Sequence, residues 1–292
     1  MRNKNWSKEE DEILKNNYEK IPPNHLTNLL PGRNYNAIKG RQTFLKICRQ
    51  YTKDNSFFKA PNILNSSIAG FTASDGHISP KKLKRKPRIF WGINTKDKGL
   101  LEQINFHLKS NYTITNSVKE VTFKSKTKKP YKYIDYKSVL CLSTADELSK
   151  DLFDNWNIPS GAKSLILGPP NITNLDICLS YIKGIIIGDG TILATDLNGT
   201  DYCKISILGT EKLLSWIKSM FEIFLKKEMD EVSVRPERSG AKIFILCITG
   251  LKASRIIDKL NQLNTLQLDR KFKRPEILNI IKSDKEKNPD LF

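Results

Sequence analysis

The sequence predicts an α+β fold in which two pseudo-symmetric units, each with the element order αββαββα, follow a small domain of three helices. Two observations predict this fold. Beyond about residue 61, the same series of apolar patterns occurs twice along the chain. Such self-similarity indicates a repeated architecture. The first 50 residues instead contain three short segments with helical spacing of apolar residues, separated by proline and glycine. The predicted parts are residues 1–50, a linker at 51–60, a first repeat at 61–168 and a second repeat at 169–292.

The three helices of the first domain are predicted from their start signals and apolar residues. The first helix begins after Ser7, since a serine followed three residues later by Glu10 forms a capping box. The second segment covers residues 26–30 and ends at a Pro-Gly pair, and the third covers residues 37–47. All three are too short to bury an apolar face alone, so we expect them to pack on one another.

This first domain resembles a Myb/SANT DNA-binding repeat. Trp6, Leu26 and Phe44 recur at about the spacing of that family's core tryptophans, and Gly32–Arg41 is similar to the start of its recognition helix. The resemblance implies a helix-turn-helix variant whose last helix reads DNA. Its contacts to base edges and phosphates would come from Arg33, Asn36, Lys39 and Arg41. The alternative is a three-helix protein-interaction module with a solvated basic face.

The net charge favours a nucleic acid partner. The chain has 49 Lys and Arg against 31 Asp and Glu, a formal charge of +18, which is far more than solubility needs. An anionic membrane surface would favour a basic amphipathic helix, whereas much of the excess lies in loop-like and strand-like runs. No stretch approaches the roughly 18 apolar residues of a membrane span, and the first residues lack a signal-peptide core. We therefore expect no membrane partner and no secretion. The expected location is the compartment of the encoding genome, either the cytoplasm of a bacterial or virus-infected cell or an organelle.

Cysteine and histidine form no metal-binding or disulfide pattern. The five cysteines include no C-x-x-C pair, and the three histidines are scattered, so neither a zinc finger nor a disulfide framework is indicated. The cysteines are predicted to be reduced thiols, and any metal is expected to have oxygen ligands.

Each repeat opens with an apolar helix and continues through the same elements. The first motif lies at Ile68–Ile78 and the second at Ile182–Ile192. Strand-like alternation follows in both, and then a helix start, at Asp97 in the first repeat and at Thr210 in the second. A further apolar strand and a final helical pattern complete each unit, which gives helix, hairpin, helix, hairpin, helix.

The two opening helices carry small residues four apart, Gly70 with Ser74 and Gly184 with Gly188. Residues four apart share a helix face, and small side chains there let another backbone come close. The two helices are therefore predicted to pack tightly on each other. Each is expected to end at an Asp-Gly pair, with the glycine in the left-handed conformation that terminates helices.

Two helices that pack side by side and end together bring Asp75 and Asp189 to one place. Close carboxylates repel unless a cation joins them, and a hard divalent ion, Mg²⁺ with Mn²⁺ as a substitute, suits such a site. The ion would activate water for attack on phosphorus and stabilise the leaving oxygen. A single Asp-Gly pair after an apolar run is ordinarily a turn. Two copies with the same downstream elements are far harder to obtain by chance.

The motifs Ile68–Gly76 (IAGFTASDG) and Ile182–Gly190 (IKGIIIGDG) resemble the two LAGLIDADG motifs of a single-chain homing endonuclease. The resemblance covers about residues 58–292. It implies a monomer with a DNA-binding saddle, which makes double-strand cuts in duplex DNA at a long asymmetric target, as in intron homing.

The resemblance also implies roles for residues of both motifs. In that family the last acidic residue of each motif binds the catalytic metals, which maps to Asp75 and Asp189. The carbonyl of the preceding residue often helps, which maps to Ser74 and Gly188.

Two further segments are similar to the family, and two positions depart from it. Gly161–Pro170 is similar to the K-S-x-x-L-x-x-P stretch that precedes the second motif, and Asp269–Pro275 occupies the analogous place near the end. Thr72 and Ile187 stand where an acidic residue is commoner. Because that earlier position does not bind the metal, we interpret the departure as minor.

Basic residues of the hairpins are assigned to DNA phosphates, because a saddle places hairpins along a groove. They are Lys82, Lys84, Arg85, Lys86 and Arg88 after the first motif, Lys126, Lys128 and Lys132 in a second run, and Lys204, Arg235, Arg238 and Lys242 in the second repeat. Alone, such runs are usually solvated faces. Lys252, just after the last strand, is the candidate for a basic residue beside the scissile phosphates, and an ordinary surface lysine is its alternative.

Two other functions remain open from the sequence. An RNA-binding maturase would use the same saddle to help a group I intron fold, although it would not need both aspartates. A Myb-type regulator without nuclease activity would owe its specific DNA binding to the first domain.

Overall fold

The computed structural model separates into two compact units. It describes residues 5–19, 21, 25–47, 50–80, 86–123, 131–197, 200–229, 234–236 and 242–292, with the backbone only at 123, 196, 197, 200, 235 and 236. Unit 1 comprises residues 1–53 with 110–113, and unit 2 comprises 54–109 with 114–292. The division at residue 53 falls within the predicted linker.

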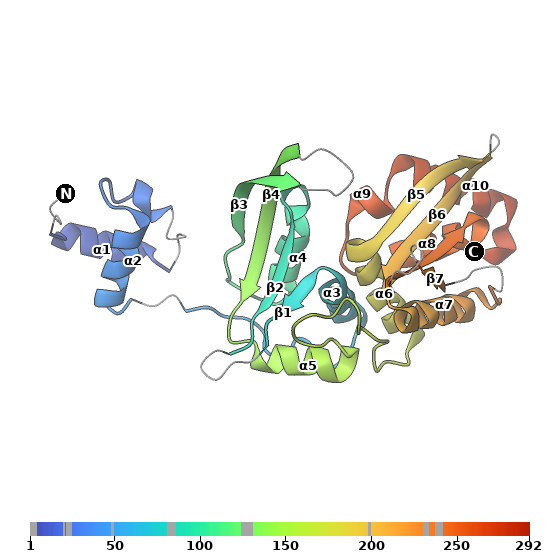
Figure 1. Cartoon of the computed structure of the whole chain (residues 1–292), viewed down its shortest axis with the longest axis horizontal. Helices are drawn as coiled ribbons and strands as arrows, with labels where there is room; N and C mark the ends of the chain where they lie inside the picture. The colour runs from blue at the N-terminus through green and yellow to red at the C-terminus, as the bar shows by residue number, and fades with distance from the viewer. Residues whose placement is uncertain are drawn as a thin grey trace. The chain divides into compact units, whose positions relative to one another are not determined.

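Unit 1 contains the three expected helical segments, but the middle one is a single 3-10 turn. The helix α1 (Lys8–Asn17) has the predicted capping box of Ser7 and Glu10. The turn η1 (Leu26–Asn28) and the helix α2 (Tyr35–Phe44) follow, as Figure 1 shows. The core is formed by Leu14, Leu26, Leu30 and Ile38, with Trp6 packed against them.

Phe44 does not belong to that core, contrary to the sequence prediction. Its side chain is 71% exposed, and its ring lies 4.6 Å from the Arg41 guanidinium instead. Ile38 is fully buried on α2, which shows that the helix turns a different face inward than the tryptophan-like spacing suggested. The Myb likeness of this unit stays a prediction.

Unit 2 confirms the repeated αββαββα order. The first repeat contains α3 (Ile63–Ser74), β1 (Gly76–Ile78), β2 (Ile89–Asn94), α4 (Lys98–His107) after the turn η2 (Thr95–Asp97), β3 (Thr115–Phe123), β4 (Tyr131–Leu142) and α5 (Asp146–Trp156). The second contains α6 (Leu175–Asp189), β5 (Gly190–Leu197), β6 (Thr200–Gly209), α7 (Glu211–Leu225), β7 (Val234–Pro236), β8 (Phe244–Thr249) and α8 (Gly250–Gln262). The segment α9 (Asp269–Phe272), the helix α10 (Pro275–Lys287) and the turn η3 (Pro289–Leu291) complete the chain.

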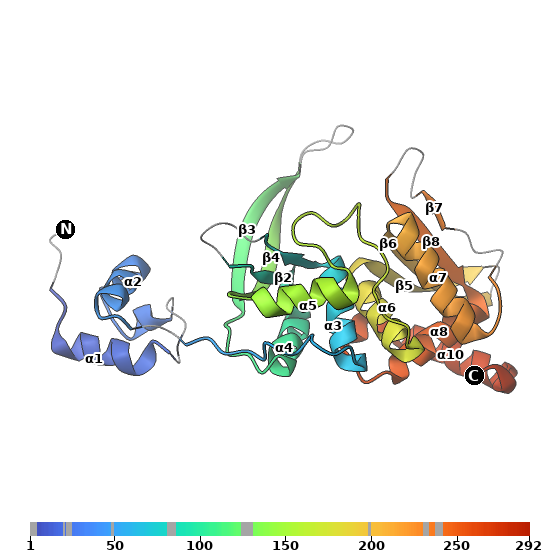
Figure 2. The same cartoon turned by 90° about the horizontal axis from the view of Figure 1, so that it is seen from below.

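Each repeat forms one four-stranded antiparallel sheet, and the strand orders correspond: β1-β2-β4-β3 in the first and β5-β6-β8-β7 in the second. Alternate residues of β2 and β6, such as Trp91 and Ile205, are fully buried against the helices. Figure 2 shows α4 along the first sheet and α8 with α10 along the second. The residues between them in sequence, such as Asn94 and Leu208, remain exposed, so each sheet has one open face.

The helices α3 and α6 pack on each other between the two sheets (Figure 1). Both are buried along nearly their whole length. A helix that is apolar all round needs partners on every side, which the opposite motif helix and the two sheets provide. Among the described residues no helix is long and apolar enough to cross a membrane.

Candidate active site

The closest approach of α3 and α6 occurs at the predicted small residues. A Cβ atom built on Gly70 would lie 2.8 Å from the Tyr181 carbonyl carbon, and one built on Gly184 would lie 2.6 Å from the Phe71 amide nitrogen. Real Cβ atoms essentially never come that close to backbone atoms. Glycine at these two positions is therefore a requirement of the helix crossing.

The crossing brings the two motif ends together. Asp75 is the C-cap of α3, and Asp189 is the last residue of α6. A Cβ atom on Gly188 would lie 3.2 Å from the Asp75 carboxyl carbon and would overlap Ser74. The end of one helix is thus in contact with the carboxylate of the other, as the duplicated motif predicted.

The glycines after the two aspartates do not adopt the left-handed conformation that we expected. Gly190 has φ −98° and ψ 162°, and neither Gly76 nor Gly190 is among the positive-φ glycines. The reason for glycine is space: a Cβ on Gly76 would lie 2.7 Å from the Thr72 Cα, and one on Gly190 would lie 2.6 Å from the Ile186 Cα. After both α3 and α6 the chain passes directly into a strand, and the first residue of that strand packs against the last turn of the helix.

The two carboxylates share a poorly hydrated environment. Burial among neighbouring atoms raises the pKa of Asp75, and the negative charge of Asp189 raises it further. Burial likewise raises the pKa of Asp189. Both groups nevertheless belong to residues that open to solvent, so a ligand can reach them. The cost of two adjacent negative charges is what a bound cation would remove.

Two lysines that the sequence alone did not single out complete the site. The Lys163 Nζ donates to the Ser74 carbonyl oxygen at 2.9 Å, directly before Asp75. The Lys271 Nζ donates to carbonyl oxygens at the end of α6, including Gly188 at 3.1 Å and Gly190 at 2.7 Å. The two lysines occupy matching places in the two repeats. The C-terminal carbonyls of a helix carry negative partial charge, which an ammonium group stabilises.

Both ammonium groups lie close enough to act on the carboxylates. Lys163 and Lys271 lower the pKa of Asp75 and of Asp189, against the larger effect of burial. Burial in turn lowers the pKa of Lys163 and lowers that of Lys271 to about 8. The signal that could have found them is the family resemblance of the segments Gly161–Pro170 and Asp269–Pro275, since Lys163 lies in the first and Lys271 in the second.

The donor set fits a hard divalent ion in part. Among the described residues no group of three or more His, Cys, Asp or Glu side chains gathers, so the side-chain ligands would be the two aspartates alone. The carbonyls of Ser74 and Gly188, predicted as further ligands, accept from the two lysines. A carbonyl oxygen has a second lone pair. Two carboxylates with several retained waters match the usual coordination of Mg²⁺.

The departures from the motif pattern have structural explanations. The Thr72 hydroxyl donates to the Ile68 carbonyl at 2.7 Å and accepts from the Trp91 indole nitrogen at 2.9 Å. Ile187 is almost fully buried. Thr72 thus fastens α3 to the first sheet, and Ile187 is packed at the edge of the cavity that Asp75 also lines.

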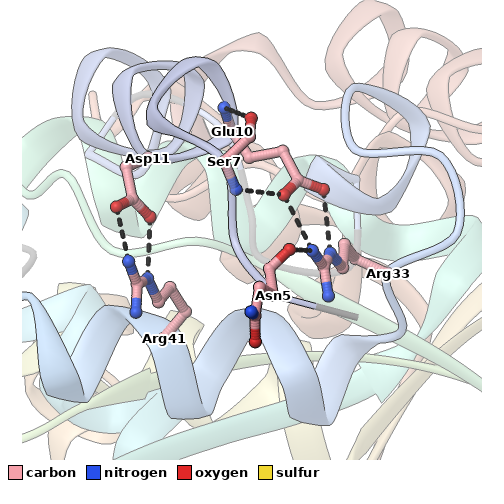
Figure 3. Close-up of polar contacts among 6 residues, drawn as sticks. All are labelled: Asn5, Ser7, Glu10, Asp11, Arg33 and Arg41. Atoms are coloured by element: carbon pink, nitrogen blue, oxygen red, sulfur yellow. Dashed lines mark hydrogen bonds and ion pairs between the residues drawn. The ribbon is translucent and has the colours of Figure 1, made fainter. Parts of the chain in front are cut away.

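The arginines assigned to DNA in unit 1 are engaged within that unit. Arg33 makes a bidentate contact with Glu10 at 2.8 Å and also donates to the Asn5 carbonyl. Arg41 makes a bidentate contact with Asp11 at 2.6–2.7 Å. Figure 3 shows both pairs joining the last helix region to α1. Asn36 and Lys39 are exposed on α2.

The other basic candidates are spread over the hairpins and strands. Exposed Lys86 lies 3.8 Å from Asp146, and exposed Arg88 precedes β2. Lys204 lies on the open face of β6, and exposed Lys242 precedes β8. The remaining basic candidates lie outside the part of the chain that the structure describes: Lys82, Lys84, Arg85, Lys126, Lys128, Arg238 and the side chain of Arg235.

Strand alternation distinguishes two faces of the long β3–β4 hairpin. Lys132 shares a face with buried Leu140 and pairs with Glu120 at 3.1 Å, so it points to the helix side. Lys119 and Lys137 lie on the open face and are exposed. These two lysines were missed because the strand register was not known. Lys252 lies in the first turn of α8 and is half-buried.

The fold and the site together define a two-repeat α+β protein whose central helices end at a shared pair of carboxylates and two lysines.

No protein-family model matches the chain, and no curated protein matches it. Its structure is similar to a number of solved structures, three of which illustrate the likeness. The first is the LAGLIDADG homing endonuclease I-GzeII in complex with its DNA target, at 13% identity over 79% of this chain and 92% of that chain, with TM-score 0.49. The second is the LAGLIDADG meganuclease I-CpaMI bound to uncleaved DNA, at 12% identity over 78% and 94%, with TM-score 0.46. The third is the homing endonuclease I-WcaI bound to its DNA recognition sequence, at 14% identity over 89% and 98%, with TM-score 0.44. At such identities and TM-scores the similarity says nothing about the reaction of this chain.

Proposed function

We propose that the chain is a monomeric, site-specific endonuclease of the LAGLIDADG type, which makes metal-dependent double-strand cuts in duplex DNA. One observation carries the proposal: two glycine-packed helices end together at Asp75 and Asp189, and each end is also contacted by a lysine, buried Lys163 in one case and half-buried Lys271 in the other. Paired carboxylates beside positive charge suit the hydrolysis of a phosphodiester, in which negative charge develops on oxygen.

The aspartates hold the ion, and the lysines stabilise the charge around it. Mg²⁺, or Mn²⁺ in its place, supplies an activated water and a stabilised leaving oxygen when bound. Asp75 and Asp189, one from each repeat, would hold the ion, and the Ser74 and Gly188 carbonyls, which also accept from Lys163 and Lys271, would be further ligands. Lys163 and Lys271 fix the ends of α3 and α6, and their positive charge attracts the scissile phosphates of the two strands.

Duplex DNA would lie along the open faces of the two sheets. Among the described residues, the phosphate contacts are assigned to exposed Arg88, Lys119, Lys137 and Lys242 and to half-buried Lys204 on the open face of β6. Lys252 is retained as a further candidate near the cut. In unit 1 the DNA contacts are assigned to Asn36 and Lys39, because the side chains of Arg33 and Arg41 are paired with Glu10 and Asp11 of α1.

The target would be long and asymmetric because the open faces of the two sheets carry different side chains, with Lys119 and Lys137 in the first repeat and Lys204 and Leu208 in the second. A chain of this kind acts on the genome that is present in its own compartment, and intron homing is the biological process that this activity would serve. The charge of +18 predicts strongly salt-dependent binding.

The decisive experiment compares the wild type with Asp75→Asn and Asp189→Asn. Purified protein and Mg²⁺ are incubated with a randomised duplex library, the cut ends are sequenced, and binding to the recovered target is measured in parallel by fluorescence anisotropy. We expect both variants to lose double-strand cutting by at least about 10³-fold while they keep the binding. Full cutting by a variant that carries both substitutions would contradict the proposal. Tight, metal-independent binding to intron RNA without any cutting of DNA would contradict it too.

A further inference from the structure

An ion pair between Asp97 and Arg270 lies beside Asp75. Asp97 precedes α4, and its carboxylate accepts from the Arg270 Nε and Nη2 at 2.6 Å each. The Asp97 side chain is only 10% exposed, whereas the Arg270 side chain is 58% exposed. The arginine therefore covers the carboxylate on one side and faces solvent on the other.

This pair opens on the same cavity as the aspartate of the first motif. A cavity of about 250 Å³ is lined by Asp75, Asp97, Arg270 and Lys271, with Gly188 of the opposite motif helix. The charge of Asp97 acts on Asp75 and raises its pKa. Two carboxylates and two cationic groups thus share one solvent-filled space at the end of α3.

The second repeat has a matching cavity without a matching ion pair. It measures about 270 Å³ and is lined by Asp189, by the hydroxyl residues Ser74, Ser164 and Thr210, and by apolar residues. Thr210 occupies the place of Asp97, since each is the N-cap residue of the helix after the first hairpin. Ala162, before Lys163, occupies the place of Arg270 before Lys271. No arginine or lysine side chain lines this second cavity among the described residues.

We propose that Arg270 binds the scissile phosphate of one DNA strand on the Asp75 side, and that Asp97 is the positioning residue that holds its guanidinium there. The inference rests on the proposed endonuclease function. Asp97 occupies two of the five N–H groups of Arg270, and the remaining donors of a planar guanidinium match a phosphate. A bidentate partner fixes the plane of the group, so the donors are preorganised before DNA arrives.

The consequence is a difference between the two strands. In the part of the chain that the structure describes, only the Asp75 cavity is lined by an arginine, so loss of Arg270 is expected to slow the cut of one strand and to leave the other unchanged. A defect in folding or in overall DNA affinity would slow both strands equally. Asp97 makes no side-chain cap contact to α4, so its replacement by asparagine removes the hold on Arg270 without removing a helix cap.

The experiment uses the full chain and a target duplex recovered with the wild type, with the two strands labelled differently. Single-turnover cutting rates are measured for Arg270→Met, Arg270→Lys and Asp97→Asn. We expect Arg270→Met to slow one strand by about 10²-fold, as for the loss of one preorganised donor, so that nicked DNA accumulates. Arg270→Lys is expected to lose less, and Asp97→Asn to slow the same strand by about 10-fold.

The matched control is Lys98→Met. Lys98 neighbours Asp97 in sequence and pairs with Glu102 at 2.8 Å, so this variant removes one positive charge without touching the cavity. Both of its strand rates should equal those of the wild type. Equal slowing of both strands by Arg270→Met, or no slowing, overturns the role of Arg270 while wild-type cutting stands. Failure of the wild type to cut either strand overturns both this inference and the proposed function.

Discussion

The two carboxylates of the proposed site, Asp75 and Asp189, lower the stability of the metal-free protein. Both pKa values are raised, chiefly by burial, so the folded state binds protons more tightly than the unfolded state. The stability of the metal-free protein therefore falls as the pH rises through the ordinary aspartate range toward the raised pKa values, and the full cost is present at neutral pH.

Asp75→Asn is accordingly expected to stabilise the metal-free protein at pH 7. The change removes, at almost constant volume, one charge that neighbouring atoms partly desolvate and that Asp189 repels. Because Asp75 is exposed, solvent screens part of this effect, and the expected gain is small. A gain of about 1 kcal/mol would raise Tm by about 2–4 °C in a domain of this size. Thermal unfolding is followed by circular dichroism in EDTA and then in Mg²⁺, which should stabilise the wild type more than the variant. The control is Asp201→Asn at an exposed position of β6, which should leave Tm unchanged; a lower Tm for Asp75→Asn would contradict the reasoning.

Lys183 is a second buried charge, within the motif helix α6. Its side chain is fully buried, its Nζ donates to the Leu263 carbonyl at 3.2 Å, and it lies 5.5 Å from the Phe272 ring. Burial lowers its pKa to about 8, with a further contribution from Lys273 and an opposing one from Asp269. Because an unfolded lysine keeps its proton to higher pH, the cost is fully present below pH 8 and disappears as the pH rises toward about 10.4.

Lys183→Met is expected to be more stable than the wild type by about 1–3 kcal/mol at pH 7, because a shift of this size corresponds to roughly 3 kcal/mol. The Leu263 carbonyl keeps contacts from Thr265 and Gln267 in the variant. Urea unfolding at pH 7, 8, 9 and 10 measures the difference in free energy of unfolding, which should shrink as the pH rises. A difference that stays constant, or that grows with pH, would show that the lysine is not charged inside the fold.

Sequence could predict the two aspartates but not the two lysines. The aspartates stand at the same place in two copies of one pattern, so the repeat alone identifies them. Lys163 reaches a carbonyl 89 residues away, and Lys271 reaches one 83 residues away. Such contacts depend on where a loop crosses the fold, which no local pattern encodes.

At the scale of helices and strands, the crossing of α3 and α6 determines the site. Gly70→Ala or Gly184→Ala would place a Cβ against backbone atoms of the other helix, which cannot move without separating the helices. We expect each variant to lose at least about 3 kcal/mol of stability, at the upper end for overpacked cores. Chemical denaturation measures the loss.

Gly99→Ala is the matched control for these two changes. Gly99 also lies in a helix, but no atom is within 4 Å of its built Cβ. The same substitution there should stabilise the protein by about 0.5–1 kcal/mol, the helix propensity difference between alanine and glycine. If all three variants behaved alike, close packing would not be the function of the motif glycines.

Helices and strands with a periodic signal were predicted well, and their ends less well. The capping box at Ser7 and the N-cap at Thr210 lie where the sequence put them. The second helical segment shrinks to one 3-10 turn at Leu26–Asn28, because prolines on both sides leave too few residues for a longer helix. The conformation of Gly190 was wrong for another reason: a strand begins at once, so the helix ends by extension of the chain and not by a left-handed turn.

At the scale of the whole molecule, duplication with divergence explains both the shared site and its asymmetry. Two copies of αββαββα supply equivalent aspartates and lysines. The Asp97–Arg270 pair takes one residue from each copy and lies on the Asp75 side alone among the described residues. The repeat order was predictable because apolar periodicity survives divergence. The direction of side chains on the β3–β4 hairpin was not, because a register shift by one residue exchanges the two faces.

The contribution of unit 1 to DNA binding gives the last prediction. Removal of residues 1–53 should weaken binding and lower its salt dependence, since each phosphate contact contributes about 0.9 to the slope of log K against log salt. Cutting at the same position should persist, because the aspartates and lysines all belong to unit 2.

In the full chain, Lys39→Ala should lower the slope of log K against log salt by about 1 without changing the position of the cut. Lys8→Ala on α1 should leave that slope unchanged. Loss of all specific recognition on truncation would instead place the specificity in unit 1, as in a Myb-type regulator, and an unchanged slope would show that unit 1 does not touch DNA.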